Sequence, residues 1–145
     1  MRQTELRDEL MDILASLYEL EAFAALAEFL QGELRILHYL LRYRHQETNP
    51  SLLSEKLHVS RSRITAALAA LRKKGFVRME VSEADRRRML VLLTARGESF
   101  IQSKKQVVEQ YFDRLVAGLG EQRVIQLRHL IQCSIEIMTE TEPAR

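Results

Sequence analysis

The sequence lacks features that define whole classes of protein. Its 145 residues include one cysteine, Cys133, which excludes an internal disulfide framework and agrees with a reducing compartment. It has no run of about 18 apolar residues, and its first residues do not combine a basic region with an apolar stretch. We therefore expect a soluble, cytoplasmic protein with no membrane partner.

The sequence also lacks the usual signatures of catalysis. It shows no glycine-rich phosphate loop, no carboxylates paired at catalytic spacing, and no nucleophile accompanied by a base and an orienting group. His38 and His45 are seven residues apart, but two histidines without a third ligand make a poor metal site. We expect no enzyme, no catalytic residue, no metal and no cofactor.

Charge is distributed unevenly along the chain. The formal net charge is only +2, yet residues 61–88 hold nine basic and three acidic side chains, a local charge of +6. The first 33 residues hold eight acids against two arginines. A local positive field on a nearly neutral chain is typical of a protein that binds a polyanion, whereas the alternative is a merely solvated charged face.

Residues 61–74 are predicted to form the helix around which the chain is organised. Ile64, Leu68 and Leu71 recur at helical spacing and make one apolar face. The opposite face is small and polar, so another surface can approach the backbone closely. Ser60 suits the N-cap of this helix, and Gly75 suits the left-handed residue that ends it. Such a helix, with basic residues at both ends, fits a DNA major groove.

The flanking segments predict a helix-turn-helix followed by a β-hairpin. Asn49 and Pro50 signal the start of a short helix that ends at Leu57, and three residues then lead into the central helix. Residues 76–81 and 89–93 read as strands, with three consecutive arginines in the intervening loop. An arginine-tipped hairpin directly after such a helix is a wing, which can enter a narrow minor groove.

The remaining segments predict amphipathic helices on both sides of this core. Residues 4–20 and 31–44 read as helices, and we expect a break or short turn within residues 21–30. The resulting divisions are 1–30 (N-terminal dimerisation helix and connector), 31–94 (winged helix-turn-helix), 95–141 (C-terminal dimerisation helices) and 142–145 (flexible tail). Dimerisation is favoured over packing within one chain, because a small winged core cannot bury three long helices. The candidate interface residues are Leu6, Leu10, Ile13, Leu17, Leu127, Ile131, Ile135 and Met138.

The chain resembles the MarR family of bacterial and archaeal transcription regulators. The most specific part of the resemblance is the wing pattern Asp-x-Arg followed by Leu-Thr-x-x-Gly, matched by Asp85, Arg87, Leu93, Thr94 and Gly97. The resemblance covers residues 32–100, about half of the chain, and the spacer at residues 21–30 departs from the family's commonest form. It implies a mainly α-helical winged helix-turn-helix fold with a small β-hairpin wing. It also implies a homodimer joined through the N- and C-terminal helices.

Chemistry and resemblance together assign roles to individual residues. Arginine can donate two hydrogen bonds to guanine, and methyl groups can contact that of thymine, which makes the outer face the candidate base reader. The base-reading candidates are Ser62, Arg63, Thr65 and Ala66, and the phosphate-positioning candidates are Ser60, Arg61, Arg72, Lys73 and Lys74. The wing candidates are Asp85, Arg86, Arg87 and Arg88. The resemblance makes Arg87 the minor-groove arginine, and Asp85 is expected to brace it by a salt bridge.

We therefore expect a transcriptional repressor that binds duplex DNA as a homodimer. Its operator is expected to be a pseudo-palindrome with half-sites about 34 Å apart. By resemblance, a small aromatic or apolar effector would release it from a pocket whose candidate residues are Tyr18, His38, Tyr39, Tyr43 and Tyr111. Two alternatives stay open: a winged-helix module that binds protein, and a redox-sensing regulator in which His129 lowers the thiol pKa of Cys133.

Overall fold

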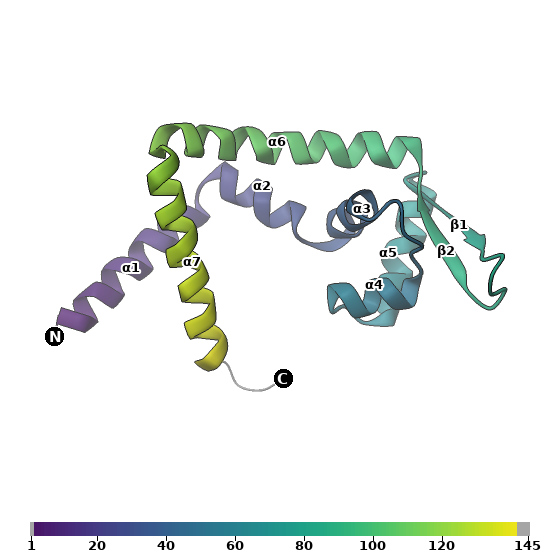
Figure 1. The fold of residues 1–145 in the computed structure, drawn as a ribbon, viewed down its shortest axis with the longest axis horizontal. Coiled ribbons are helices and arrows are strands. Elements are labelled where there is room, and N and C mark those ends of the chain that lie inside the picture. The colour runs from purple at the N-terminus through teal and green to yellow at the C-terminus, as the bar shows by residue number, and fades with distance from the viewer. Residues whose placement is uncertain (1, 142–145) are drawn as a thin grey trace. The chain divides into compact units, whose positions relative to one another are not determined.

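The computed structural model describes residues 2–141, and the tail expected at residues 142–145 lies outside these residues. The chain divides into two compact units, Met1–Val108 and Glu109–Arg145, and the division falls within α6. The elements, labelled in Figure 1, are α1 Arg2–Tyr18, α2 Glu21–Phe29, α3 Gly32–Arg42, α4 Pro50–Leu57, α5 Arg61–Lys73, β1 Val77–Val81, β2 Met89–Leu93, α6 Ala95–Leu119 and α7 Glu121–Thr141.

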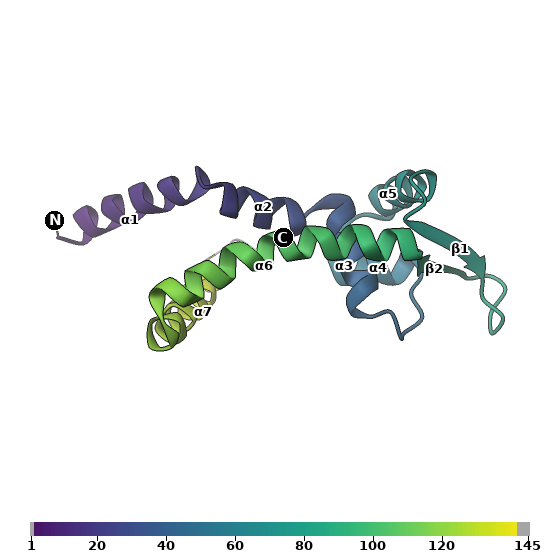
Figure 2. The same cartoon turned by 90° about the horizontal axis from the view of Figure 1, so that it is seen from above.

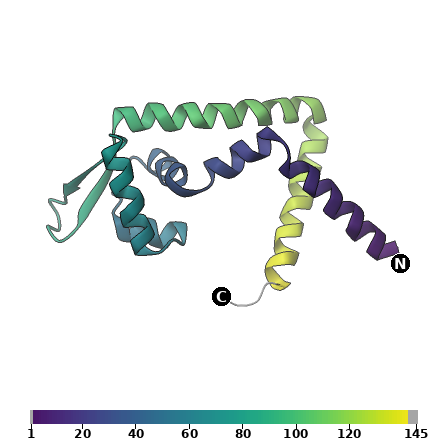
Figure 3. The same ribbon diagram turned by 180° about the vertical axis from the view of Figure 1, so that it is seen from behind.

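The first unit holds a helix-turn-helix followed by a hairpin, as predicted. α4 and α5 pack together, with α5 behind α4 in Figure 1 and in front of it in Figure 3. β1 and β2 pair antiparallel in a register that sets Val77 opposite Leu93 and Val81 opposite Met89. This hairpin projects beyond α3, α4 and α5 (Figure 2), and its loop, residues 82–88, forms the tip.

The hydrophobic core of this unit joins α3, α4 and α5 to the hairpin. The apolar face predicted for the central helix is confirmed, because Ile64, Leu68 and Leu71 are all buried. Val77 and Val91 bring the two strands onto the same core. Burial of these side chains stabilises the position of α5, since each buried aliphatic side chain contributes roughly 1.5–3 kcal/mol.

Side-chain caps set the boundaries of the helices. Asn49 Oδ1 accepts a hydrogen bond from the Leu52 amide at 2.9 Å, and Ser60 Oγ accepts one from the Arg63 amide at 3.3 Å. α5 ends where Gly75 adopts a φ of 79°, which lets the amides of Gly75 and Phe76 bond back to the last turn of the helix. The predicted start signals of α4 and α5 and the predicted end signal of α5 are confirmed.

The junction between β2 and α6 explains the Leu-Thr-x-x-Gly pattern. Thr94 Oγ1 accepts a hydrogen bond from the Gly97 amide at 3.0 Å and donates one to the Gly75 carbonyl at 2.6 Å. This double contact ties the start of α6 to the end of α5. Gly97 is buried where α6 passes the Phe76 carbonyl, and a Cβ on Gly97 would lie 2.1 Å from that oxygen.

Replacing Gly97 by alanine is therefore expected to destabilise the protein. The added methyl group meets backbone, which cannot move aside as a flexible side chain can, so we expect a loss of about 2 kcal/mol or more in the free energy of unfolding. Urea unfolding measures this loss. Gly118→Ala is the matched control: it lies in the same helix with open space around it, and should stabilise the helix by up to about 1 kcal/mol.

One prediction for the N-terminal segment, a break within residues 21–30, is wrong. Residues 21–30 were expected to contain a break or short turn, but Glu21–Phe29 form the helix α2. The breaks lie on either side: α1 ends at Tyr18, where the amides of Glu19 and Leu20 make tighter bonds to residues three positions back. The connector within the predicted division 1–30 is therefore itself helical.

Two helices carry apolar stripes that the described chain leaves uncovered. Neither α1 nor α7 has a buried residue, although both show apolar residues at helical spacing. All eight candidate interface residues are exposed: Leu6, Leu10, Ile13, Leu17, Leu127, Ile131, Ile135 and Met138. No helix within residues 2–141 is both long enough and apolar enough to span a membrane.

Candidate nucleic-acid interface

The outward face of α5 is exposed along its whole length. All nine candidates on and beside this helix are exposed: Ser60, Arg61, Ser62, Arg63, Thr65, Ala66, Arg72, Lys73 and Lys74. The small side chains lie in the first two turns, with basic residues around and after them. Thr65 donates its hydroxyl to the Arg61 carbonyl at 2.9 Å, so its methyl group and its oxygen lone pairs remain for another partner.

The two ends of α5 are anchored to neighbouring helices. At its start, the Arg61 guanidinium donates a hydrogen bond to Ser51 Oγ on α4. At its end, Lys74 Nζ lies 2.7 Å from Glu33 Oε2 in the first turn of α3. Lys74 is thus already ion-paired, whereas Arg72 and Lys73 have no ion-pair partner among residues 2–141. Sequence reasoning treated these three cations alike, because the pairing with Glu33 joins residues 41 positions apart.

The wing tip is a closed loop organised by Asp85 and Ser82. The Ser82 amide bonds to the Arg88 carbonyl at 3.0 Å, and the Arg88 amide bonds to the Asp85 carbonyl at 2.9 Å. Asp85 Oδ1 accepts from both the backbone amide and the Nε of Arg87, at 3.1 Å and 3.2 Å. The predicted salt bridge between Asp85 and Arg87 is therefore present, and it leaves the Arg87 side chain 92% exposed.

Arg86 and Arg88 complete the set of wing arginines. Arg88 Nε lies 3.7 Å from Asp85 Oδ2, so one carboxylate holds two of the three arginines. Arg86 is exposed and makes no ion pair within the described part of the chain. The tip therefore presents two guanidinium groups paired with Asp85, those of Arg87 and Arg88, and one exposed guanidinium group, that of Arg86.

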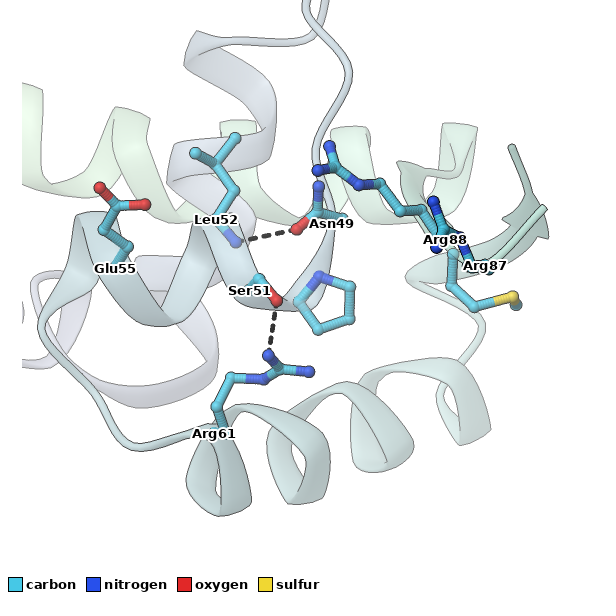
Figure 4. Close-up of a pocket in the computed structure, with 9 residues that line it drawn as sticks. Asn49, Ser51, Leu52, Glu55, Arg61, Arg87 and Arg88 are labelled. Atoms are coloured by element: carbon cyan, nitrogen blue, oxygen red, sulfur yellow. Dashed lines mark hydrogen bonds between the residues drawn. The ribbon is translucent and has the colours of Figure 1, made fainter. Parts of the chain in front are cut away.

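A pocket of about 360 Å³ joins the start of α4, the start of α5 and the wing (Figure 4). Arg61 borders it from α5, and Arg87 and Arg88 border it from the wing. Ser51 lies between them, at the beginning of α4. A phosphate-positioning candidate at the start of α5 and two wing candidates thus border the same pocket.

Sequence reasoning missed the roles of Ser51 and Ser82. Ser51 follows the Asn49-Pro50 helix start directly, which is a position where exposed amides attract anions, so the signal was available. Ser82 is only 3% exposed, and its hydroxyl accepts a hydrogen bond from the Asp85 amide at 3.4 Å. Nothing in the local sequence marks Ser82, because its burial depends on how the hairpin loop closes.

The aromatic effector candidates are only partly brought together. The ring centroids of Tyr39 on α3 and Tyr43 just after it lie 4.6 Å apart, and those of His38 and Phe29 lie 4.7 Å apart. Tyr43 also lines a cavity of about 130 Å³ beside β2, to which His38 and Tyr39 do not contribute.

The other two candidates lie elsewhere in the chain. The ring centroid of Tyr18 lies 4.8 Å from that of Phe23, and Tyr18 is 73% exposed. Tyr111 belongs to the second unit. The effector pocket as a single site therefore stays a prediction.

His38 gives the fold a predictable dependence on pH. Burial lowers the pKa of His38 below its usual value, and the nearby charges of Lys105 and Arg42 lower it further. The neutral imidazole is thus favoured in the folded state, so the free energy of unfolding should be greatest above about pH 6.5 and should decrease as the pH falls towards the lowered pKa. Urea unfolding between pH 8 and pH 5 measures this trend, which His38→Gln should reduce; an unchanged slope would contradict it.

Other candidate chemistry is sparse. Cys133 Sγ lies 3.6 Å from His129 Nε2 on α7, so the predicted proximity is confirmed, while redox sensing stays a prediction. Within residues 2–141, no group of three or more histidine, cysteine or acidic side chains is placed to hold a metal ion.

Comparison with known proteins identifies the winged helix. A family model described as MarR family matches residues 30–88. MepR, described as a transcription regulator of the Staphylococcus aureus multidrug efflux pump MepA, superposes on 90% of this chain and 97% of its own, with 16% identity and a TM-score of 0.68. The YusO protein from Bacillus subtilis covers 92% and 94%, with 17% identity and a TM-score of 0.70.

Two further structures have the same fold and contain bound molecules. The heme sensor protein PefR, solved with heme and carbon monoxide, covers 94% of this chain and 97% of its own, with 18% identity and a TM-score of 0.63. A variant of MepR was solved bound to an oligodeoxyribonucleotide, with 16% identity, coverages of 91% and 97%, and a TM-score of 0.62.

Proposed function

We propose that this chain, whose residues 30–88 match a MarR family model, is a winged-helix regulator that represses transcription by binding duplex DNA sequence-specifically. The observation that carries the proposal is the pocket bordered by both Arg61 of α5 and the wing arginines. This pocket brings the start of α5 next to the arginine-tipped wing. The oligonucleotide bound to the similarly folded MepR variant supports the same reading.

In this proposal, α5 reads the major groove and the wing enters an adjacent minor groove. The outer face of α5 supplies hydrogen-bond donors in Arg63 and Ser62 and methyl groups in Thr65 and Ala66. Arg72 and Lys73 bind phosphates and set the register of the helix. Arg87, held by Asp85, reaches the minor groove, whose negative potential attracts arginine.

The functional form in this proposal is a homodimer. The exposed apolar stripes of α1 and α7 support it, because contiguous apolar surface of this kind marks a protein interface. A twofold pair of recognition helices would read a pseudo-palindrome whose half-sites lie about 34 Å apart.

A small aromatic or apolar effector would release the operator by changing the separation of the two recognition helices. A rigid duplex accepts only a narrow range of separations, so a shift of a few ångströms is enough in principle. The aromatic side chains on α3 support a ligand of this chemistry, and PefR, which has the same fold, was solved with heme.

Selection of bound sequences from a random duplex pool tests the proposal. At about 150 mM salt, where backbone-only binding is suppressed, a pseudo-palindrome with half-sites one helical turn apart should be enriched. Binding without enrichment would instead indicate an architectural role. No binding by effector-free protein would favour the alternative, a winged-helix module that binds protein.

A further inference from the structure

The pocket beside α4 occupies the place where a DNA backbone must pass if the proposed function holds. A major groove and the adjacent minor groove are separated by one sugar-phosphate strand. If α5 occupies the first groove and the wing the second, that strand crosses the surface between them. The surface between α5 and the wing is the pocket lined by Ser51, Arg61 and Arg88.

The pocket offers donors that are suited to a phosphate oxygen. Pro50 has no amide proton, the Leu52 amide bonds to the Asn49 side chain, and the Leu53 amide bonds to the Asn49 carbonyl. The Ser51 amide is thus the one donor of this first turn without a partner among residues 2–141. Ser51 Oγ accepts its hydrogen bond from Arg61, which leaves the hydroxyl proton free to be donated.

The charges around the pocket favour a singly charged anion. Arg61, Arg87 and Arg88 line it, and Glu55 is the one acid that does so. In Figure 4, Glu55 lies on the far side of Ser51 from the two wing arginines. Asp85 lies outside the lining and offsets part of the charge of Arg87 and Arg88. A phosphodiester carries one negative charge, which matches this modest positive excess.

We propose that this pocket binds one phosphodiester group of the DNA backbone through Arg61, Arg88 and Ser51. The inference rests on the proposed function and adds a division of labour to the wing. Arg87 reads the minor groove, whereas Arg88 and Arg61 hold the phosphate between the two grooves. Ser51 completes the site with its amide and its hydroxyl, so α4 takes part in binding and does more than support α5.

A scan with methylphosphonates, which remove the charge of one phosphate at a time, tests this proposal on the duplex selected above. A methylphosphonate at one position in each half-site should lower the affinity of the wild-type protein about tenfold, which corresponds to the loss of one hydrogen bond to a charged group. Arg61→Gln and Arg88→Gln should each weaken binding to unmodified duplex about tenfold and should both lose sensitivity at that same position. Ser51→Ala should lose part of its sensitivity to the methylphosphonate at that position, and less of it than either arginine variant.

Arg86→Gln is the matched control, because it removes one charge from the wing tip but does not line the pocket. It should keep full sensitivity at the shared position. Glu55→Gln should strengthen binding about twofold by removing a repulsive charge. The five residues replaced in these variants are exposed, so each variant should keep the melting temperature of the wild-type protein: Ser51, Glu55, Arg61, Arg86 and Arg88.

The outcomes separate this inference from the proposed function. If the wild-type protein selects an operator but Arg61→Gln and Arg88→Gln lose sensitivity at different phosphates, the shared site is overturned and the function stands. A second result would also overturn the proposal. In it, inorganic phosphate shifts the Ser51 amide resonance at constant ionic strength, but neither arginine variant loses sensitivity to any methylphosphonate. The pocket would then bind a free anion and not the DNA backbone. A wild-type protein that binds no duplex overturns both.

Discussion

Replacing Arg87 by alanine is expected to weaken operator binding at least about tenfold while leaving the fold intact. The Arg87 side chain is 92% exposed, so its loss creates no cavity and should change the free energy of unfolding by less than about 0.5 kcal/mol. In the proposed complex, however, this guanidinium enters a narrow groove where its charge is attracted strongly. Asp85 holds the side chain in place beforehand, so little conformational entropy is lost on binding.

Measurement of affinity for the selected operator, together with the melting temperature, tests this expectation. Arg78→Ala is the control, because it removes an exposed arginine that is likewise held by a carboxylate, Glu80, on the strand leading to the wing. That variant should lose much less affinity. Equal losses for the two variants would mean that Arg87 contributes only to the general positive field, and an unchanged affinity for Arg87→Ala would refute its role.

The helix-turn-helix and the wing could be predicted from the sequence because their signals are local. Asn49 and Pro50 start α4, Ser60 caps α5, and Gly75 ends α5 with a positive φ, each within a few residues of the boundary that it sets. The alternation of residues 76–81 predicted β1 to within one residue, and residues 89–93 were predicted as the strand that forms β2. Where the chain itself carries the boundary signal, the expected and observed elements agree to within about a residue.

The sequence could not predict features that depend on distant partners or on weak boundaries. α2 was missed because Leu20 caps it without any side-chain hydrogen bond, and its alanine-rich composition gave no clear apolar face. The ion pair between Lys74 and Glu33 and the hydrogen bond between Arg61 and Ser51 both join separate elements. For this reason the candidate residues of the site were named, but the pocket that relates α5 to the wing was not.

Introducing two carboxylates into the apolar stripe of α7 is expected to produce a monomer that has lost most of its operator affinity. Ile131 and Ile135 are one turn apart and are 49% and 59% exposed, so Ile131→Asp combined with Ile135→Asp should leave the fold of the single chain unchanged. In the proposed dimer these positions are buried against the partner, where unpaired charges are strongly unfavourable. Sedimentation velocity should show the monomer.

The accompanying loss of operator affinity should be at least about 100-fold, because a monomer engages one half-site and gives up the effective concentration that the second half-site provides. Gln122→Asp combined with Gln126→Asp is the matched control: it places two carboxylates one turn apart on the same helix, on the side away from Ile131. That variant should remain a dimer and keep its affinity. If the isoleucine variant also remained a dimer, the apolar stripe of α7 would not be the interface. If the wild-type protein were itself monomeric, the exposed stripe would need another partner. A monomer would then also give no reason to expect a palindromic operator.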